Sequence, residues 1–226
     1  MANAAEAFGV HMDPGLQRRA REARIEVLTG ALRGSALVER LMAVPFVERD
    51  AWLDALLGFD VPPPDVPDLP QGVVPYLPSG VAEILAMVQE APVGAGDVLV
   101  DLGSGLGRAL ILAHLVSGAR AHGIEIQAPL VAGARARCAE LGLGQLTFTH
   151  ANAAEVALDG SRFFLYAPCN GAMLVRLLAR LREVAQRRPI VVGTVGFELH
   201  DVAWLAPRAS SCCSLMLYDS RPSSPD

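Results

Sequence analysis

The sequence predicts an α/β fold with a doubly wound, mostly parallel sheet and an N-terminal helical cap, a Rossmann-like arrangement. Short apolar runs alternate with helical segments along the second half of the chain, a pattern typical of strand–helix–strand units with right-handed crossovers. The first of these runs ends in a glycine-rich turn. With 226 residues, 52% of them apolar, the chain can bury the core of one such domain and an elaboration.

The pattern divides the chain into four regions. Residues 1–60 are predicted to form the helical cap, and residues 61–78 a Pro-rich connector. Five prolines among residues 61–70 exclude helix and favour extended, semi-rigid backbone. Residues 79–219 are predicted to form the main domain, and residues 220–226 a disordered tail.

The cap has apolar side chains at helical spacing. We expect helices within residues 14–58, two of them at 35–42 and 48–57. The expected apolar faces comprise Leu16, Ala20, Ala23, Val27 and Leu28 in the first helix and Trp52, Leu53, Leu56 and Leu57 in the last. Arg18, Arg19, Arg21 and Arg24 are expected to form a solvated basic face.

The main domain is predicted to alternate between helices and strands. Strands are expected at 97–102, 119–125, 145–149, 162–166 and 189–195, with a last strand at 211–218. Helices are expected at 79–90, with Ser79 as the N-cap, and at 106–117, 128–141 and 172–186, with a short helical piece at 153–156. Only about 20 residues remain between the fifth strand and the predicted tail, so a sixth strand ahead of the last would be short or missing.

The most informative local signal is the turn after the strand that contains Asp101. Glycines stand at 103, 105 and 107, where they allow a sharp turn and leave no Cβ to obstruct a ligand. Asp101 lies where open α/β sheets place their ligands. A dinucleotide fingerprint has its third glycine one position later, and this carboxylate would repel a pyrophosphate. The pattern instead suits a ligand that carries a cationic amino group.

The motif of Asp101, Gly103, Ser104, Gly105 and Gly107 resembles the first motif of class I S-adenosylmethionine-dependent methyltransferases. The resemblance implies S-adenosyl-L-methionine as the cofactor, with this loop around its methionine part.

Two further parts of the chain carry the resemblance. Glu125 ends the second strand 20 residues after Gly105, and the resemblance implies that it takes both ribose hydroxyls, with Ile126 beside it. Asn152, followed by Ala153, stands where the family usually has an Asp that accepts a hydrogen bond from the adenine amino group. An amide oxygen can still accept that bond.

Tyr76 and Ser79 precede the glycine motif in a segment that resembles non-SET protein-lysine methyltransferases. In those enzymes this segment contributes to the cofactor site, so we expect both residues to contact the cofactor.

The end of the fourth strand is, by the resemblance, the part of the sheet that faces the transferred methyl group. Tyr166 and Asn170 are therefore the candidate catalytic residues, positioning an acceptor by hydrogen bonds, and Tyr166 is also a candidate cofactor contact. A half-buried Tyr166 with a locally satisfied hydroxyl is an equal alternative. Because Tyr166 stands where base-methylating enzymes have an amide or acid, methylation of nucleic-acid bases is disfavoured.

Neither the histidines nor the cysteines predict a metal site. His150 and His200 fall near strand ends and are candidate general bases, solvated or core histidine being the alternative. Cys138, Cys169, Cys212 and Cys213 lack zinc-ligand spacing. Cys169, at the tip of the fourth strand, is expected to be a small inert apolar residue.

We therefore predict a methyltransferase (EC 2.1.1 class) that acts by in-line displacement on an oxygen or nitrogen nucleophile of a small molecule. The alternatives are a protein-lysine methyltransferase, a nicotinamide-dependent oxidoreductase and a non-catalytic binding module. A net charge of −5 argues against a nucleic-acid partner. The sequence shows no apolar run of bilayer length and no signal-peptide pattern, so we expect a cytoplasmic protein without membrane contact. The oligomeric state is left open.

Overall fold

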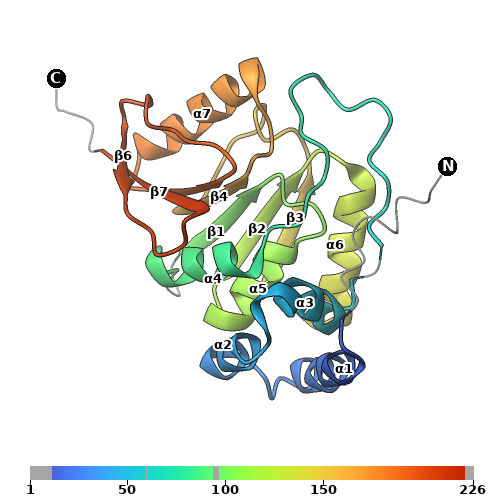
Figure 1. The fold of residues 1–226 in the computed structure, drawn as a ribbon. Coiled ribbons are helices and arrows are strands. Elements are labelled where there is room, and N and C mark those ends of the chain that lie inside the picture. The colour runs from blue at the N-terminus through green and yellow to red at the C-terminus, as the bar shows by residue number, and fades with distance from the viewer. Residues whose placement is uncertain (1–11, 60, 94–96, 222–226) are drawn as a thin grey trace.

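The protein is built around a seven-stranded sheet. The structure, a computed structural model, describes residues 12–59, 61–93 and 97–221, and in these the strand order is β3-β2-β1-β4-β5-β7-β6 (Figure 1). Parallel strands comprise β1 (Val98–Leu102), β2 (Arg120–Glu125), β3 (Leu146–His150), β4 (Arg162–Tyr166) and β5 (Val191–Val195). Antiparallel to them, β7 (Leu215–Ser220) lies between β5 and β6 (Leu205–Arg208). The predicted doubly wound, mostly parallel sheet is confirmed.

Helices cover both faces of the sheet, because successive strand side chains point to opposite sides. Leu99 and Phe164 face α4 (Val81–Glu90), α5 (Arg108–Ser117) and α6 (Ala128–Glu140). Val100 and Phe163 face α7 (Gly171–Ala185). The chain leaves β1 toward β2 and β3 and then returns to β4, so its direction reverses between β1 and β4. Ligand sites of open α/β sheets lie at this switch point.

The cap consists of α1 (Pro14–Leu28), α2 (Gly34–Met42) and α3 (Arg49–Leu57), with a short 3-10 turn at Phe46–Glu48. Helix α1 begins where Asp13 Oδ1 accepts hydrogen bonds from the N–H groups of Gly15 (2.9 Å) and Leu16 (3.1 Å). The predicted stripe on α3 is confirmed, since its four apolar side chains are at most 1% exposed. The cap packs against α4 and α5, below the sheet in Figure 1.

Two predictions about α1 are wrong. Leu28 is 45% exposed, because it occupies the last helical position, a third of a turn beyond the buried Val27. Arg24 does not belong to a solvated face, because its guanidinium pairs with Glu140 of α6 and donates to the Leu56 carbonyl oxygen at 3.0 Å. This arginine ties α1 to both α3 and α6.

Residues 61–78 do more than connect the cap to the sheet. The segment crosses the carboxyl ends of the strands. There, Val74 N–H donates to the Pro168 carbonyl oxygen at 3.1 Å. The Gly72 carbonyl oxygen accepts from Asn170 N–H at 2.8 Å. Asp65 Oδ1 accepts from Tyr76 N–H (3.0 Å) and from Gln127 Nε2 (2.6 Å). The segment is therefore fastened over the sheet edge in an extended conformation.

The structure corrects three element boundaries. Helix α4 begins at Val81, not at Ser79, because Asp50 Oδ1 of α3 accepts the Val81 N–H at 2.8 Å in place of an N-cap side chain. Residues 153–156 form a turn rather than a helical piece, since Asn152 Oδ1 accepts from Ala154 N–H at 3.0 Å. The last strand begins at Leu215, after a turn at 211–214, and continues to Ser220.

The sixth strand exists as the short β6. Parts of the predicted cap and tail, residues 1–11, 60 and 222–226, lie outside the described residues. No helix in the described ranges combines the length and the apolar character needed to cross a bilayer.

Arg108 joins the cap to the glycine loop. Its side chain is 4% exposed and donates to Asp54 Oδ1 (2.7 Å), to Asp50 Oδ1 (3.0 Å) and to the Ser79 carbonyl oxygen. The two carboxylates offset the cost of burying the guanidinium.

We expect Arg108→Met to lower the free energy of unfolding by about 3 kcal/mol, because it leaves the carboxylates of Asp50 and Asp54 facing each other beside a buried carbonyl. Urea unfolding followed by circular dichroism measures this. The matched control is Arg180→Met on α7, whose exposed pair with Glu183 should contribute at most about 0.5 kcal/mol. Equal losses in the two variants would contradict a clamping role for Arg108.

Candidate functional site

A narrow cleft lies between the carboxyl ends of the central strands and residues 73–77 of the crossing segment. Of the residues predicted from the sequence, it is lined by Tyr76, Gly103, Glu125, Ile126, Asn152, Ala153 and Tyr166. Asp101, Ser104, Gly105 and Gly107 belong to the strand end and loop that adjoin it. The structure thus brings together strand ends that are distant in the sequence.

Glu125 holds the glycine loop. Its carboxylate is buried, with Oε2 accepting from Gly105 N–H at 2.9 Å and Oε1 from Gln127 N–H at 2.8 Å. Each carboxylate oxygen has a further lone pair with which it can accept from a ligand hydroxyl. The side chain therefore shapes the loop and also lines the cleft.

Asp101 and Ser104 are buried beside Glu125, and each carries a polar atom that lacks a partner. Among the described residues, neither Asp101 Oδ1 nor Ser104 Oγ has a hydrogen-bond partner. Burial, together with the charge of Glu125, raises the pKa of the Asp101 carboxyl to about 8. A cationic donor next to Asp101 would satisfy this oxygen and favour the ionised form.

The loop glycines also make room for the protein itself. Gly103 has φ +92°, and a Cβ there would lie 2.6 Å from Pro168 Cβ. Gly105 has φ +53°, and the Tyr76 ring packs directly against it. Side chains at either position would be strained and would also collide. The glycines are thus required by packing and backbone conformation even without a ligand, so they alone do not indicate one.

Asn152 is engaged within its own turn. Its Oδ1 accepts from Ala154 N–H at 3.0 Å and its Nδ2 donates to Glu155 Oε1 at 2.8 Å. The second lone pair of Oδ1 remains as an acceptor toward the cleft. Ile126 and Ala153, on either side, contribute apolar and backbone surface to the same end of the cleft.

Ser79 and Asn170 do not line the cleft. The carbonyl oxygen of Ser79 accepts from Arg108, and its side chain is buried at the start of α4. Asn170 precedes α7 and lines a second depression with Gln71 and Arg176, which shares Ile126 and Asn152 with the cleft. Their assignments to cofactor and acceptor therefore have no support from position and remain predictions.

Tyr166 and Cys169 are the side chains with reactive groups at the β4 end of the cleft. Burial, followed by the charges of Glu83 and Asp50, raises the pKa of the Tyr166 hydroxyl, so it stays protonated and can donate a hydrogen bond. Burial raises the pKa of the Cys169 thiol to about 11, which keeps it protonated at neutral pH. Between them Ala167 has φ +38°, a conformation that costs a non-glycine residue about 1–2 kcal/mol.

The two candidate histidine bases lie away from the cleft lining. His150 Nε2 is 3.0 Å from the Ile126 carbonyl oxygen, and the side chain is exposed. His200 Nε2 lies 3.0 Å from Glu198 Oε2 and is also exposed. Neither position supports a role as general base.

Gln127 and Pro168 line the cleft but were not among the predicted site residues, and neither was Asp65, which contacts Gln127. Gln127 is buried, with its Oε1 accepting from Val66 N–H at 2.9 Å and its Nε2 donating to Asp65. Pro168 covers Gly103. Asp65 and Gln127 have no shared spacing or motif, so the contact between them could be found only in the folded chain.

The fold has solved counterparts. An RNA methyltransferase from Salinibacter ruber in complex with S-adenosyl-L-homocysteine matches with a TM-score of 0.54 and 28% identity, over 66% of this chain and 97% of that one. A putative methyltransferase from Escherichia coli matches with a TM-score of 0.53 and 17% identity, over 69% and 92% of the two chains, and shows the fold alone. No protein-family model matches the chain, and its sequence matches no curated protein.

The sheet order, the glycine loop with its two strand-end carboxylates, and the Salinibacter neighbour lead to one assignment. The fold is that of the class I S-adenosylmethionine-dependent methyltransferases, which the chain resembles in sheet order and in the position of its glycine loop.

The raised pKa of Asp101 predicts a pH dependence of stability for the ligand-free protein. An unfolded Asp has a pKa of about 3.9, so between about pH 4 and pH 8 the folded chain binds a proton that the unfolded chain does not. The free energy of unfolding should therefore fall as pH rises through this window, by up to about 1.4 kcal/mol per pH unit.

Asp101→Asn has no proton to lose at this position, so it should be less sensitive to pH than the parent between about pH 5.5 and 7.5. Urea unfolding at several pH values in this range gives the two slopes, and titration of the histidines cancels in their difference. Identical slopes would show that Asp101 is ionised in the folded protein.

Proposed function

We propose that the cleft binds S-adenosyl-L-methionine and that the protein transfers its methyl group to an oxygen or nitrogen nucleophile of a small molecule. The observation that carries the proposal is the buried, unpartnered Oδ1 of Asp101 beside Glu125. An acidic pair of this kind suits a ligand with one ammonium group and a pair of hydroxyls.

The residues of the cleft fit the parts of this cofactor. Asp101 and Ser104 would hold the amino group of the methionine part, and Glu125 would accept from the ribose hydroxyls with its free lone pairs. Ile126, Asn152 and Ala153 would adjoin the adenine. The Salinibacter neighbour supports the proposal, because its structure contains S-adenosyl-L-homocysteine.

The cofactor, when bound, supplies a methyl group made electrophilic by its sulfonium. The protein has to hold an acceptor in line with that group and to exclude water, and positioning of this kind can contribute about 7–11 kcal/mol at best. Tyr166, at the end of β4, can orient an acceptor by donating a hydrogen bond from its protonated hydroxyl.

Binding requires the crossing segment to move. The cleft encloses a free volume of only about 60 Å³, whereas small-molecule sites typically have volumes of about 300–1,000 Å³. The Tyr76 ring on Gly105 and Pro168 on Gly103 fill the space over the loop. An outward shift of residues 73–77 would widen the cleft and leave the sheet unchanged.

The charges of the chain disfavour RNA as the acceptor and a nicotinamide dinucleotide as the cofactor. The Salinibacter neighbour acts on RNA, but this chain has a net charge of −5, which opposes binding to a polyanion. A protein lysine remains the alternative acceptor. Asp101 would repel the pyrophosphate of a nicotinamide dinucleotide, which disfavours an oxidoreductase.

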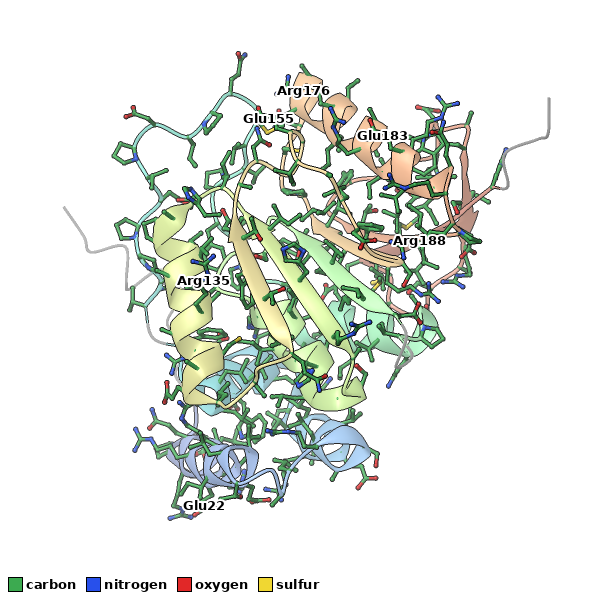
Figure 2. All side chains as sticks on the ribbon, turned by 180° about the vertical axis from the view of Figure 1, so that it is seen from behind. Glu22, Arg135, Glu155, Arg176, Glu183 and Arg188 are labelled. Atoms are coloured by element: carbon green, nitrogen blue, oxygen red, sulfur yellow. The ribbon has the colours of Figure 1, made fainter. Side chains whose placement is uncertain are left out.

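Isothermal titration calorimetry with S-adenosyl-L-homocysteine tests the proposal. We expect binding to the parent protein and at least a tenfold weaker affinity for Glu125→Ala, because that variant loses both the ribose acceptor and the support of the Gly105 N–H. The matched control is Glu22→Ala on α1, an exposed position far from the strand ends in Figure 2, which should bind like the parent.

Absence of binding to the parent protein would contradict the proposal, and binding of NADH in the same experiment would favour the oxidoreductase. Unchanged affinity in Glu125→Ala would remove Glu125 from the site. Binding without methyl transfer to any component of a cell extract would favour a non-catalytic binding module.

A further inference from the structure

A second groove adjoins the cleft, and Tyr166 belongs to the walls of both. The groove has a volume of about 720 Å³ and lies between the cap, the start of α4 and the turn at 211–214. The turn is held to α4 by Ser214 Oγ, which donates to Glu83 Oε1 at 2.5 Å, and by Ser211 N–H, which donates to Glu90 Oε1 at 2.9 Å. An acceptor in this groove would approach the β4 end of the cleft from outside.

The groove is mostly apolar. Its walls include Val38, Met42, Phe46, Val81 and Leu85. Met42 and Phe46 are 55% and 71% exposed, although both are large apolar side chains. Such exposure next to a groove is typical of a surface that binds an apolar ligand.

The positive charges of the groove already have partners. Arg108 is matched by Asp50 and Asp54. The Arg49 guanidinium donates to the carbonyl oxygens of Leu41 (3.1 Å) and Val44 (3.2 Å) at the end of α2 and lies 5.6 Å from the centre of the Phe46 ring.

Glu83 is the groove carboxylate without a cation. In the described part of the chain it forms no ion pair, and it accepts a hydrogen bond from the neutral hydroxyl of Ser214. It is half-buried and near enough to Tyr166 for its charge to raise the pKa of that hydroxyl. The walls of this apolar groove thus include both a carboxylate, Glu83, and a phenol, Tyr166.

We infer that this groove binds the methyl acceptor and that the acceptor is a primary amine at the end of an unbranched apolar chain. The inference rests on the proposed function, since it needs a methyl donor in the adjoining cleft. The carboxylate of Glu83 would pair with the ammonium group, and the apolar walls would cover the methylene chain.

Methyl transfer to the amine needs no reactant other than the cofactor and water. The bound ammonium first loses a proton to water at the open side of the groove. The nitrogen lone pair then attacks the methyl carbon, the bond from this carbon to sulfur breaks, and its electron pair stays on sulfur. The nitrogen gains the positive charge that the sulfonium loses, so the methylated amine remains paired with Glu83.

Two sources provide this chemistry, a free alkylamine and a lysine side chain, which carries its amine on four methylenes. The probes are n-octylamine, with octanoate and n-octanol as matched compounds without the amine, and a lysine-containing peptide. Binding is measured by calorimetry with saturating S-adenosyl-L-homocysteine present, and transfer is measured with a tritium-labelled methyl donor.

We expect n-octylamine to bind and octanoate not to bind, because octanoate brings a second carboxylate next to Glu83. Glu83→Gln should weaken amine binding about tenfold and leave the affinity for S-adenosyl-L-homocysteine unchanged. Glu183→Gln on α7, an exposed acid on the other face of the sheet labelled in Figure 2, should change neither affinity.

Label that appears in n-octylamine identifies a free amine as the source, and label confined to the peptide identifies lysine. If S-adenosyl-L-homocysteine binds but neither amine binds or accepts label, or if Glu83→Gln binds amines like the parent, the inference is wrong. If S-adenosyl-L-homocysteine itself does not bind, the proposed function fails instead.

Discussion

The structure depends on two carboxylates, Asp101 and Glu125, buried at the carboxyl ends of the neighbouring parallel strands β1 and β2. Burial, followed by the charge of Glu125, raises the pKa of the Asp101 carboxyl. Glu125 has backbone N–H donors for both of its oxygens. Among the described residues, Asp101 Oδ1 has no hydrogen-bond partner, and neither has Ser104 Oγ.

The rest of the architecture positions this pair. The Glu125 carboxylate holds Gly105, and the Tyr76 ring lies on that glycine from the crossing segment. Asp65 and Gln127 fasten the same segment to the start of α6. Arg108, directly after the loop, connects the cap to it through Asp50 and Asp54. Movement of residues 73–77 would therefore change the packing of the glycine loop and of the groove beyond Tyr166.

Periodicity and the glycine motif were enough to predict the parallel sheet, the helices and most of the cleft lining. These features are local, because strand alternation, helical spacing and turn residues are each encoded within a few positions. The turn at 153–156, the start of α4 at Val81 and the burial of Arg24 depend on partners more than 20 residues away or on a side chain that competes for a backbone donor. Tertiary contacts decided the start of α4 and the burial of Arg24, and a local side-chain cap decided the turn.

The candidate site was likewise predictable only where a local motif marks its residues. The motif predicted Asp101 and Glu125, whereas Gln127, Asp65 and Glu83 have no local signature. From the sequence, the loop glycines indicate a ligand. In the structure, their contacts with Tyr76 and Pro168 explain them without one. Evidence for a ligand comes instead from the unpartnered oxygens of Asp101 and Ser104. The cap forms one wall of the groove and packs mainly against α4 and α5.

The central claim, that Asp101 is the partner of a cationic amino group, is tested most directly by a crystal structure of the protein with S-adenosyl-L-homocysteine. The account predicts the amino group of this compound within hydrogen-bonding distance of Asp101 Oδ1, with residues 73–77 displaced outward from the glycine loop. A bound compound whose amino group lies elsewhere, with Asp101 Oδ1 still buried and unpartnered, would contradict it.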